Sequence, residues 1–237
     1  RFFRKINDQM KLLLENWRKF INEEYEPITT LRIFDFDETI AHTRSEIRVK
    51  APNGSEATLG SQKEFEDYMK DAAAKEGIEA FDAVLELQEL GYQIDFSDFS
   101  IVKEPEEITI VTDILKSFSE DSKTYIMTAR RGNSIGPIID YLEDIGIDST
   151  QVRVMATQGK SKGDVIATMI KQKIMDDGKS NIHRIEYYED SQKNIDDVFD
   201  KVCNNELLRE IKPEDFELVV IKVIKNDSGY KLDSFGC

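Results

Sequence analysis

The stretch LRIFDFDETIAH, residues 31–42, joins a short apolar run to a cluster of polar residues. Asp35 and Asp37 lie one residue apart where the apolar run ends, and Thr39 follows two positions later. Two neighbouring carboxylates repel each other. The pattern is therefore typical either of a solvated strand end or helix cap, or of a site that uses both charges. The residues that follow the other apolar runs decide between these interpretations.

Short apolar runs alternate with amphipathic stretches along much of the chain. After the strand that ends near Asp35, strands are predicted at 124–129, 152–156, 184–190 and 216–224, and helices at about 134–145, at 162–174 and from about 192. This alternation predicts right-handed βαβ crossovers. The expected fold is α/β and Rossmann-like, with a mostly parallel sheet and helices on both faces. Ligands bind such sheets beyond the carboxyl ends of the strands.

The alternation is interrupted between residues 44 and 106. A hairpin turning at Asn53-Gly54 is predicted there, followed by a helix at about 62–75. The segment contains 15 acidic and 7 basic residues, so it carries over half of the net charge of −15. We therefore expect three parts, namely an N-terminal helical extension (1–28), a core (29–43 and 107–237) and an inserted cap (44–106).

A helix is predicted at residues 5–24, where apolar residues from Ile6 to Phe20 recur at spacings of four and three. One interpretation is a helix that packs on its own domain. The alternative is a helix that docks a protein partner.

The composition excludes several classes of protein. The chain of 237 residues is 40% hydrophobic and 33% charged, as in soluble globular proteins. Its apolar runs are too short to predict a membrane span. The net charge of −15 disfavours nucleic acid as a partner. The charge does not exclude a small anionic substrate, because a bound metal or a few local cations can reverse the field inside a cleft. Cys203 and Cys237 have no CxxC partner, so a reducing cytoplasmic location is the default expectation.

Polar side chains follow four of the predicted strands. They are Asp35, Asp37 and Thr39 after the first, Thr128, Arg130 and Arg131 after the second, Lys160 and Lys162 after the third, and Glu189 and Asp190 after the fourth. The ends of parallel strands share one sheet edge, so these groups are expected to converge. Three carboxylates suit a hard divalent cation, and Mg²⁺ is the expected one. A hydroxyl and a lysine beside it suit the oxygens of a phosphoryl group.

These four elements together resemble the haloacid dehalogenase-like (HAD) superfamily over roughly residues 31–200. The elements are DxDxT after the first strand, a strand ending in Thr128, a lysine opening a later helix, and the acidic pair Glu189-Asp190. The insertion lies at the position of that superfamily's C1-type cap. The segments DFSDF, MTAR and YYEDSQKNI resemble phosphatase-like members, some of them phage-encoded.

The resemblance implies a role for each matching residue. Asp35 would be the nucleophile and a Mg²⁺ ligand. Asp37 would act as general acid and base, with its backbone carbonyl on the metal. The Thr39 hydroxyl would orient the loop, Thr128 and a lysine would hold phosphoryl oxygens, and Asp190 would complete the metal shell with Glu189 beside it.

Some assignments stay open. Lys162 is favoured over Lys160 as the motif lysine because it directly precedes the helix pattern, and the division of metal binding between Glu189 and Asp190 is undecided. Arg130, Arg131 and His42 are candidate substrate-binding residues. For the two arginines, a solvated pair or a salt bridge is an equally good interpretation, and a surface histidine is the simpler one for His42.

The resulting expectation is a Mg²⁺-dependent HAD-type phosphatase that acts on a small phosphorylated substrate through an aspartyl-phosphate. The alternatives are a polynucleotide end phosphatase, a phosphotransferase, and a non-enzymatic binding or assembly protein with a retained core.

Overall fold

The computed structural model describes residues 29–78, 83–119, 121–177, 182–206, 208 and 215–236. The predicted helix at 5–24 lies outside these residues. In the described part of the chain, no helix combines the length and apolar character needed to cross a membrane.

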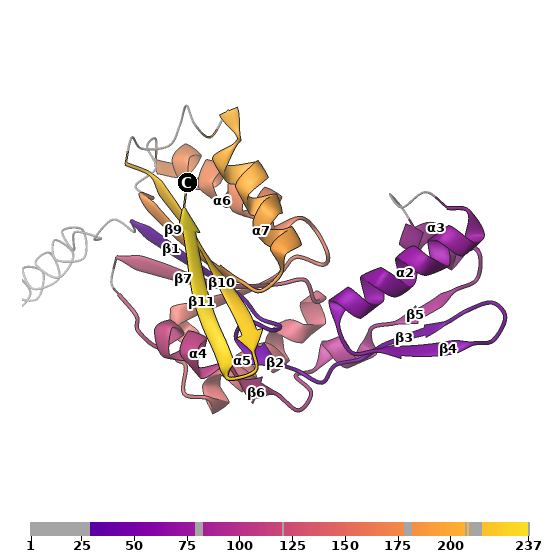
Figure 1. The fold of residues 1–237 in the computed structure, drawn as a ribbon. Coiled ribbons are helices and arrows are strands. Elements are labelled where there is room, and N and C mark those ends of the chain that lie inside the picture. The colour runs from indigo at the N-terminus through magenta and orange to yellow at the C-terminus, as the bar shows by residue number, and fades with distance from the viewer. Residues whose placement is uncertain are drawn as a thin grey trace, which may run out of the picture.

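A six-stranded sheet forms the centre of the molecule (Figure 1), with the strand order β11-β10-β9-β1-β7-β8. The strands are β1 (Thr30–Asp35), β7 (Ser122–Thr128), β8 (Val152–Ala156), β9 (Arg184–Glu189), β10 (Glu217–Asn226) and β11 (Gly229–Gly236). The pairings from β10 to β8 are all parallel, and β11 joins β10 as an antiparallel edge strand. The mostly parallel α/β sheet is thus confirmed, with β1 at its centre, whereas β11 was not predicted.

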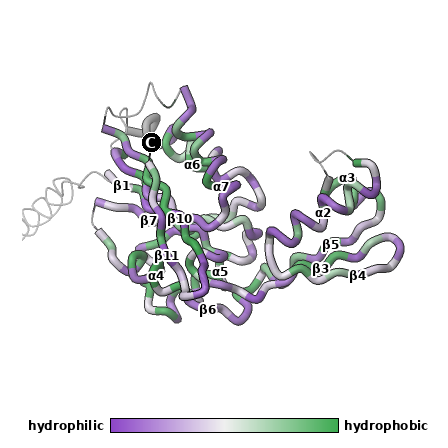
Figure 2. The backbone as a smooth tube through the Cα atoms, viewed as in Figure 1, coloured by the Kyte–Doolittle hydropathy of each residue, from purple (hydrophilic) through white to green (hydrophobic). Residues whose placement is uncertain are grey.

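Helices cover both faces of this sheet (Figure 1). They are α4 (Thr109–Leu115), α5 (Ile135–Asp144), α6 (Lys162–Asp177) and α7 (Gln192–Val198), the last continuing as a π-helical turn at Phe199–Cys203. One apolar cluster joins the sheet to α6 and α7, and a second joins it to α4 and α5. In Figure 2, β10 is hydrophobic along much of its length, as a strand covered on both faces requires.

The alternation of side chains along each strand distributes residues between the two faces. Leu31 and Ile33 of β1 lie in the cluster with α6 and α7, whereas Phe34 lies in the cluster with α4 and α5. On β9, Ile185 and Tyr187 share the α6 face. This period of two therefore directs the last residues of both strands, Asp35 and Glu189, toward α6.

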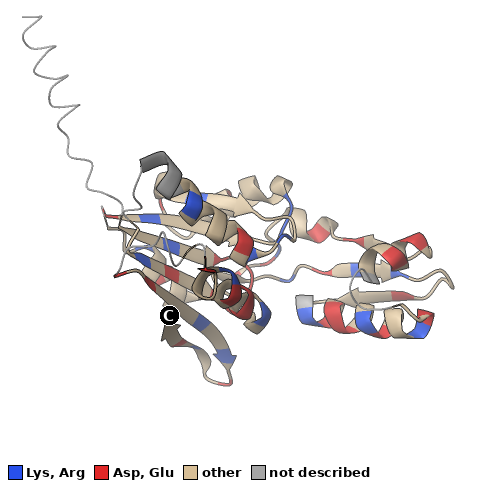
Figure 3. Cartoon of the chain, turned by 90° about the horizontal axis from the view of Figure 1, so that it is seen from above, with Lys and Arg blue, Asp and Glu red and all other residues tan. Residues whose placement is uncertain are grey.

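Residues 44–106 contain a separate three-stranded antiparallel sheet with the order β4-β3-β5. Its elements are β3 (Ile47–Lys50), β4 (Glu56–Leu59), α2 (Gln62–Glu76), α3 (Ala83–Glu89), β5 (Gln93–Asp95) and a 3₁₀ turn, η1 (Ser97–Ser100). The predicted hairpin is present, with Gly54 at φ +85° in the turn. This insertion has its own apolar cluster and stands beside the large sheet (Figure 1). Acidic and basic residues are interspersed along α2 (Figure 3).

Two short strands mark the base of the insertion. The strand β2 (Ala41–His42) pairs antiparallel with β6 (Glu106–Glu107). A backbone hydrogen bond of 3.0 Å from Arg44 N to Lys103 O joins the outgoing and returning segments just above this pair.

Cys203 is disulfide-bonded. Because disulfides persist mainly in oxidising compartments, the cysteines give no support to the expectation of a reducing cytoplasmic location.

Candidate functional site

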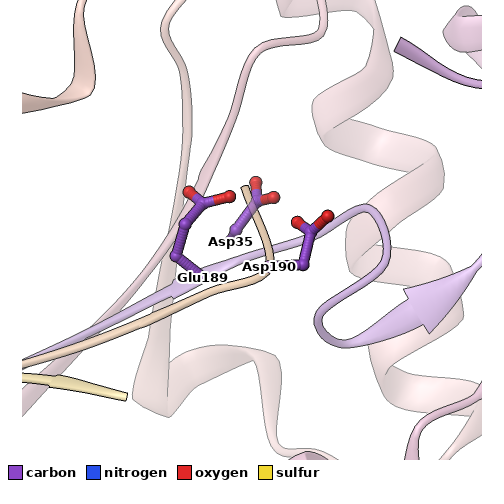
Figure 4. A group of neighbouring side chains, drawn as sticks. All are labelled: Asp35, Glu189 and Asp190. Atoms are coloured by element: carbon purple, nitrogen blue, oxygen red, sulfur yellow. The ribbon is translucent and has the colours of Figure 1, made fainter. Parts of the chain in front are cut away.

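Three carboxylates converge at the carboxyl edge of the sheet. Asp35 ends β1, Glu189 ends the neighbouring strand β9, and Asp190 follows directly. Each offers an oxygen within 4.8 Å of the others, and Figure 4 shows the three carboxylates gathered together. Carboxylate oxygens are the ligands that hard divalent cations prefer, so this donor set fits Mg²⁺.

Lys162 brings a positive charge into the acidic cluster. Its Nζ lies 2.7 Å from Asp35 Oδ1 and 2.7 Å from Glu189 Oε2. Only 3% of the Lys162 side chain is exposed. Lys160, the other candidate for the motif lysine, is exposed. The contacts of Lys162 therefore favour it over Lys160.

The position of Lys162 is set by the close packing of α6 on α7. Asp197 of α7 accepts hydrogen bonds from Ser161 Oγ at 2.7 Å and from Gly163 N at 2.9 Å, which satisfies the amino end of α6. A Cβ at Gly163 would lie 2.6 Å from the Asp197 carbonyl oxygen. Glycine next to Lys162 therefore permits the approach of the two helices that holds the ammonium beside Asp35.

Glu189 accepts three hydrogen bonds from protein donors. Its Oε2 accepts hydrogen bonds from Lys162 and from the Tyr187 hydroxyl, and its Oε1 accepts one of 3.1 Å from Ser191 N. Tyr187 was not among the predicted site residues. The strand period of two was the available signal, because it places residues 187 and 189 on the same face of β9.

The environment moves the pKa values of the three acids apart. Burial, followed by the charge of Glu189, raises the pKa of Asp35 well above its usual value. The same two causes raise the pKa of Asp190 to about 8. Burial acts in the same direction on Glu189, but the charge and hydrogen bond of Lys162 outweigh it and hold the pKa of Glu189 below its usual value. Lys162 is likewise held charged, because the two carboxylates raise its pKa against the effect of burial.

The raised pKa of Asp190 predicts a pH-dependent stability for the metal-free protein. Between its usual pKa of 3.8 and the raised value of about 8, the folded state binds more protons than the unfolded chain. Stability therefore falls as pH rises through this window. Glu189, whose pKa is lowered from the usual 4.5, loses its contribution only at a pH below the range from about pH 5 to about pH 8. We expect the thermal midpoint measured with a chelator to fall by several degrees between about pH 5 and about pH 8.

Two comparisons identify which group causes the fall of the thermal midpoint with pH. The Asp190→Asn variant should show a smaller fall of the midpoint with pH, and the remainder comes from Asp35, whose pKa is also raised. Mg²⁺ should raise the midpoint of the unsubstituted protein more at high than at low pH, because the cation takes the place of a proton. If the midpoint of Asp190→Asn fell with pH as steeply as that of the unsubstituted protein, Asp190 would not be the cause.

Asp37 lies beside this cluster and is paired with Arg130. The guanidinium donates from Nε to Asp37 Oδ2 at 2.9 Å and from Nη2 to Oδ1 at 2.6 Å. The Arg130 side chain is 1% exposed and that of Asp37 is 29% exposed. Arg130 therefore forms a salt bridge, which was one of the interpretations left open for it.

The two threonines of the predicted site are both fully buried. Thr128 Oγ1 accepts a hydrogen bond of 3.2 Å from Arg130 N, so it shapes the turn after β7. Within the described residues, Thr39 Oγ1 has no hydrogen-bond partner, so the expected loop-orienting bond is not seen.

The other two candidate substrate-binding residues lie near the surface. Arg131 is exposed. His42 Nδ1 is hydrogen-bonded to Glu38, whose backbone has φ +59°, in the left-handed region. The structure thus places His42 at the end of β2, beside Glu38 of the turn that follows Asp37.

A pocket of about 220 Å³ opens beside Asp190. It is lined by Glu38, Asp190, Lys222, Val223, Ile224, Lys225 and Tyr230. Lys222 pairs in register with Glu189, so the remainder of β10 extends past the end of β9 and forms one wall. None of the residues of this wall was among the predicted site residues.

Comparisons of the chain with protein-family models, with curated proteins and with solved structures find no match.

Proposed function

We propose that this protein is a Mg²⁺-dependent phosphohydrolase of HAD type, which acts on a small phosphomonoester through an aspartyl-phosphate intermediate. The observation that carries the proposal is the surroundings of Asp35. Its buried carboxylate lies 2.7 Å from Lys162, within 4.8 Å of Glu189 and Asp190, and two residues before Asp37.

The residues of the site divide the chemistry between them. Asp35 attacks phosphorus through a carboxylate oxygen, and the bond from phosphorus to the leaving oxygen breaks while Asp37 protonates that oxygen. Asp37 then accepts a proton from water, the water oxygen bonds to phosphorus, and the bond from phosphorus to Asp35 breaks to release inorganic phosphate. Lys162 lies where its ammonium can stabilise the phosphoryl oxygens.

The metal would be held mainly by Asp35 and Asp190. Glu189 is already engaged by Lys162, Tyr187 and Ser191, so it serves chiefly to hold Lys162 beside Asp35. Bound Mg²⁺ supplies the positive charge that lets an anionic phosphate approach an anionic nucleophile.

The charge of the chain supports a small substrate. The net charge of −15 opposes the approach of a polynucleotide. In this proposal the insertion acts as a cap over the carboxyl edge of the sheet.

The proposal predicts release of inorganic phosphate from a panel of aryl, sugar and nucleotide monophosphates in the presence of Mg²⁺, and loss of that release with a chelator. A 5′-phosphorylated oligonucleotide is the matched polynucleotide and should be a poor substrate. The same assay with added alcohols or sugars as acceptors separates hydrolysis from phosphoryl transfer. Absence of turnover across the panel, together with absence of Mg²⁺ binding by calorimetry, would favour a non-enzymatic assembly protein.

A further inference from the structure

Arg130 makes more contacts than its pairing with Asp37 requires. Its Nη1 donates to the backbone carbonyls of Phe99 at 3.3 Å and Ile101 at 2.5 Å, and its Nη2 also donates to Thr43 Oγ1 at 3.0 Å. The guanidinium carbon lies 5.1 Å from the centre of the Phe99 ring and 5.3 Å from that of Phe36. All three side-chain nitrogens are therefore engaged.

These partners come from both segments that join the insertion to the core. We call the segments, residues 43–45 and 99–103, the neck. Thr43 and Ser45 belong to the outgoing segment, and Phe99 and Ile101 to the returning one. Arg130 itself follows β7 of the core. One buried side chain thus contacts the core acid Asp37 and both segments of the neck, which are the two connections visible in Figure 1.

The same contacts leave one acceptor position of Asp37 open. A carboxylate has about four lone-pair positions. Oδ1 accepts from Arg130 Nη2 and from Thr43 Oγ1, at 2.6 and 3.1 Å, and Oδ2 accepts from Arg130 Nε at 2.9 Å. The remaining position is on Oδ2, and the Asp37 side chain is 29% exposed. The two hydrogen bonds from the Arg130 guanidinium therefore leave Oδ2 as the oxygen through which Asp37 can transfer a proton, and they fix its direction.

We infer that Arg130 is a positioning residue, which fixes the Asp37 carboxylate for proton transfer and ties it to both segments of the neck. The inference rests on the proposed phosphohydrolase function. Its consequence is that a displacement of the neck displaces the acid, so that proton transfer depends on where the insertion lies.

The test uses the dependence of the reaction on the leaving group. An alkoxide must be protonated as it departs, whereas 4-nitrophenolate leaves with little help from an acid. For Arg130→Met we expect kcat/KM to fall roughly 10²- to 10⁴-fold with an alkyl phosphate. With 4-nitrophenyl phosphate, kcat/KM should change by no more than a few-fold, because it reports only the steps through the first irreversible one. Release of 4-nitrophenol should then show a burst, since water attack on the aspartyl-phosphate still needs Asp37.

Two variants separate positioning from structural damage. Arg130→Lys keeps the positive charge but cannot donate from two nitrogens to both Asp37 oxygens, so its kcat/KM with the alkyl phosphate should lie between those of the wild type and Arg130→Met. Arg32→Met is the matched control, because Arg32 is also buried and donates to the carbonyls of Ser117 and Ile114 at 2.6 and 2.7 Å. Removing Arg32 should lower kcat/KM for both substrates by the same factor, if at all.

A further variant tests whether the contact of Arg130 with the neck matters for the position of Asp37. Phe99→Ala removes the returning-segment ring that packs on the guanidinium. It should reproduce the leaving-group effect at roughly 3- to 30-fold. An equal effect on both substrates would overturn the link to the neck.

The outcomes distinguish this inference from the function on which it rests. Wild-type protein that hydrolyses neither substrate would overturn both. Wild-type turnover combined with equal losses for the two substrates in Arg130→Met would overturn the positioning role alone. Arg130→Met and Asp37→Asn should also be non-additive in the double variant.

Discussion

Replacement of Asp35 by asparagine is expected to abolish phosphate release while leaving the fold intact. The amide cannot form the aspartyl-phosphate, and loss of a nucleophile typically removes most of the rate enhancement of a covalent mechanism. We expect turnover to fall by at least about 10⁴-fold on every substrate that the wild-type protein hydrolyses. Activated aryl phosphates should lose as much as alkyl ones, because the missing group makes the bond to phosphorus.

The stability of this variant follows from the electrostatics of the cluster. Burial and neighbouring acids raise the pKa of Asp35, so its charged form is costly in the folded state and a neutral amide is cheaper to bury. The loss of one partner of Lys162 acts in the opposite direction. We therefore expect a thermal midpoint within a few degrees of the wild type.

Asp140→Asn is the matched control for Asp35→Asn. Asp140 lies on α5 and is exposed, and the substitution changes the formal charge by the same amount. Its turnover should be that of the wild type. Retention of activity in Asp35→Asn would mean that another group attacks phosphorus, and the aspartyl-phosphate mechanism would have to be abandoned.

Replacement of Lys162 by methionine is expected to cost both stability and activity. The side chain is 3% exposed and lies 2.7 Å from both Asp35 and Glu189. Removing one member of a buried ion pair leaves the other charge uncompensated, which typically costs about 3–5 kcal/mol. Denaturant unfolding of the metal-free protein at neutral pH measures this loss. The activity should fall as well, because Glu189 loses the group that it holds beside Asp35.

The destabilisation by Lys162→Met should itself depend on pH. In acid the carboxylates of the cluster become neutral and need no counter-charge, so the loss should be smaller at about pH 5 than at about pH 8. Lys160→Met makes the same change two residues away on an exposed side chain and should leave both stability and turnover unchanged. A Lys162→Met variant as stable as the Lys160→Met variant would show that the cluster is not held by that ammonium.

Much of the core was predictable from local patterns. The strand at 152–156 was predicted with the bounds that the structure has, and α6 begins at the predicted residue, Lys162. Both follow from signals within a few residues, namely an apolar run and a helix pattern. The convergence of Asp35 and Glu189 was also predictable, because neighbouring parallel strands end at one edge and the strand period sets which face each residue occupies.

The partners of individual side chains were not predictable in this way. Arg130 meets Asp37 across 93 positions of sequence and meets the neck carbonyls across about 30. Arg131 has the same charge and follows directly, yet it is exposed whereas Arg130 is buried. No local pattern separates the two, because the difference depends on where the insertion rejoins the core.

The sequence by itself determined the alternation of strands and helices, the interruption at 44–106, and the acidic residues that end β1 and β9. The tertiary structure decided which groups act on one another, namely Lys162 rather than Lys160 beside Asp35, Tyr187 on Glu189, and Arg130 between Asp37 and the neck. The physical reason is range. Propensity and periodicity act over a few residues, whereas the partner of a buried charge is set by the crossovers and helix packing that bring distant segments together.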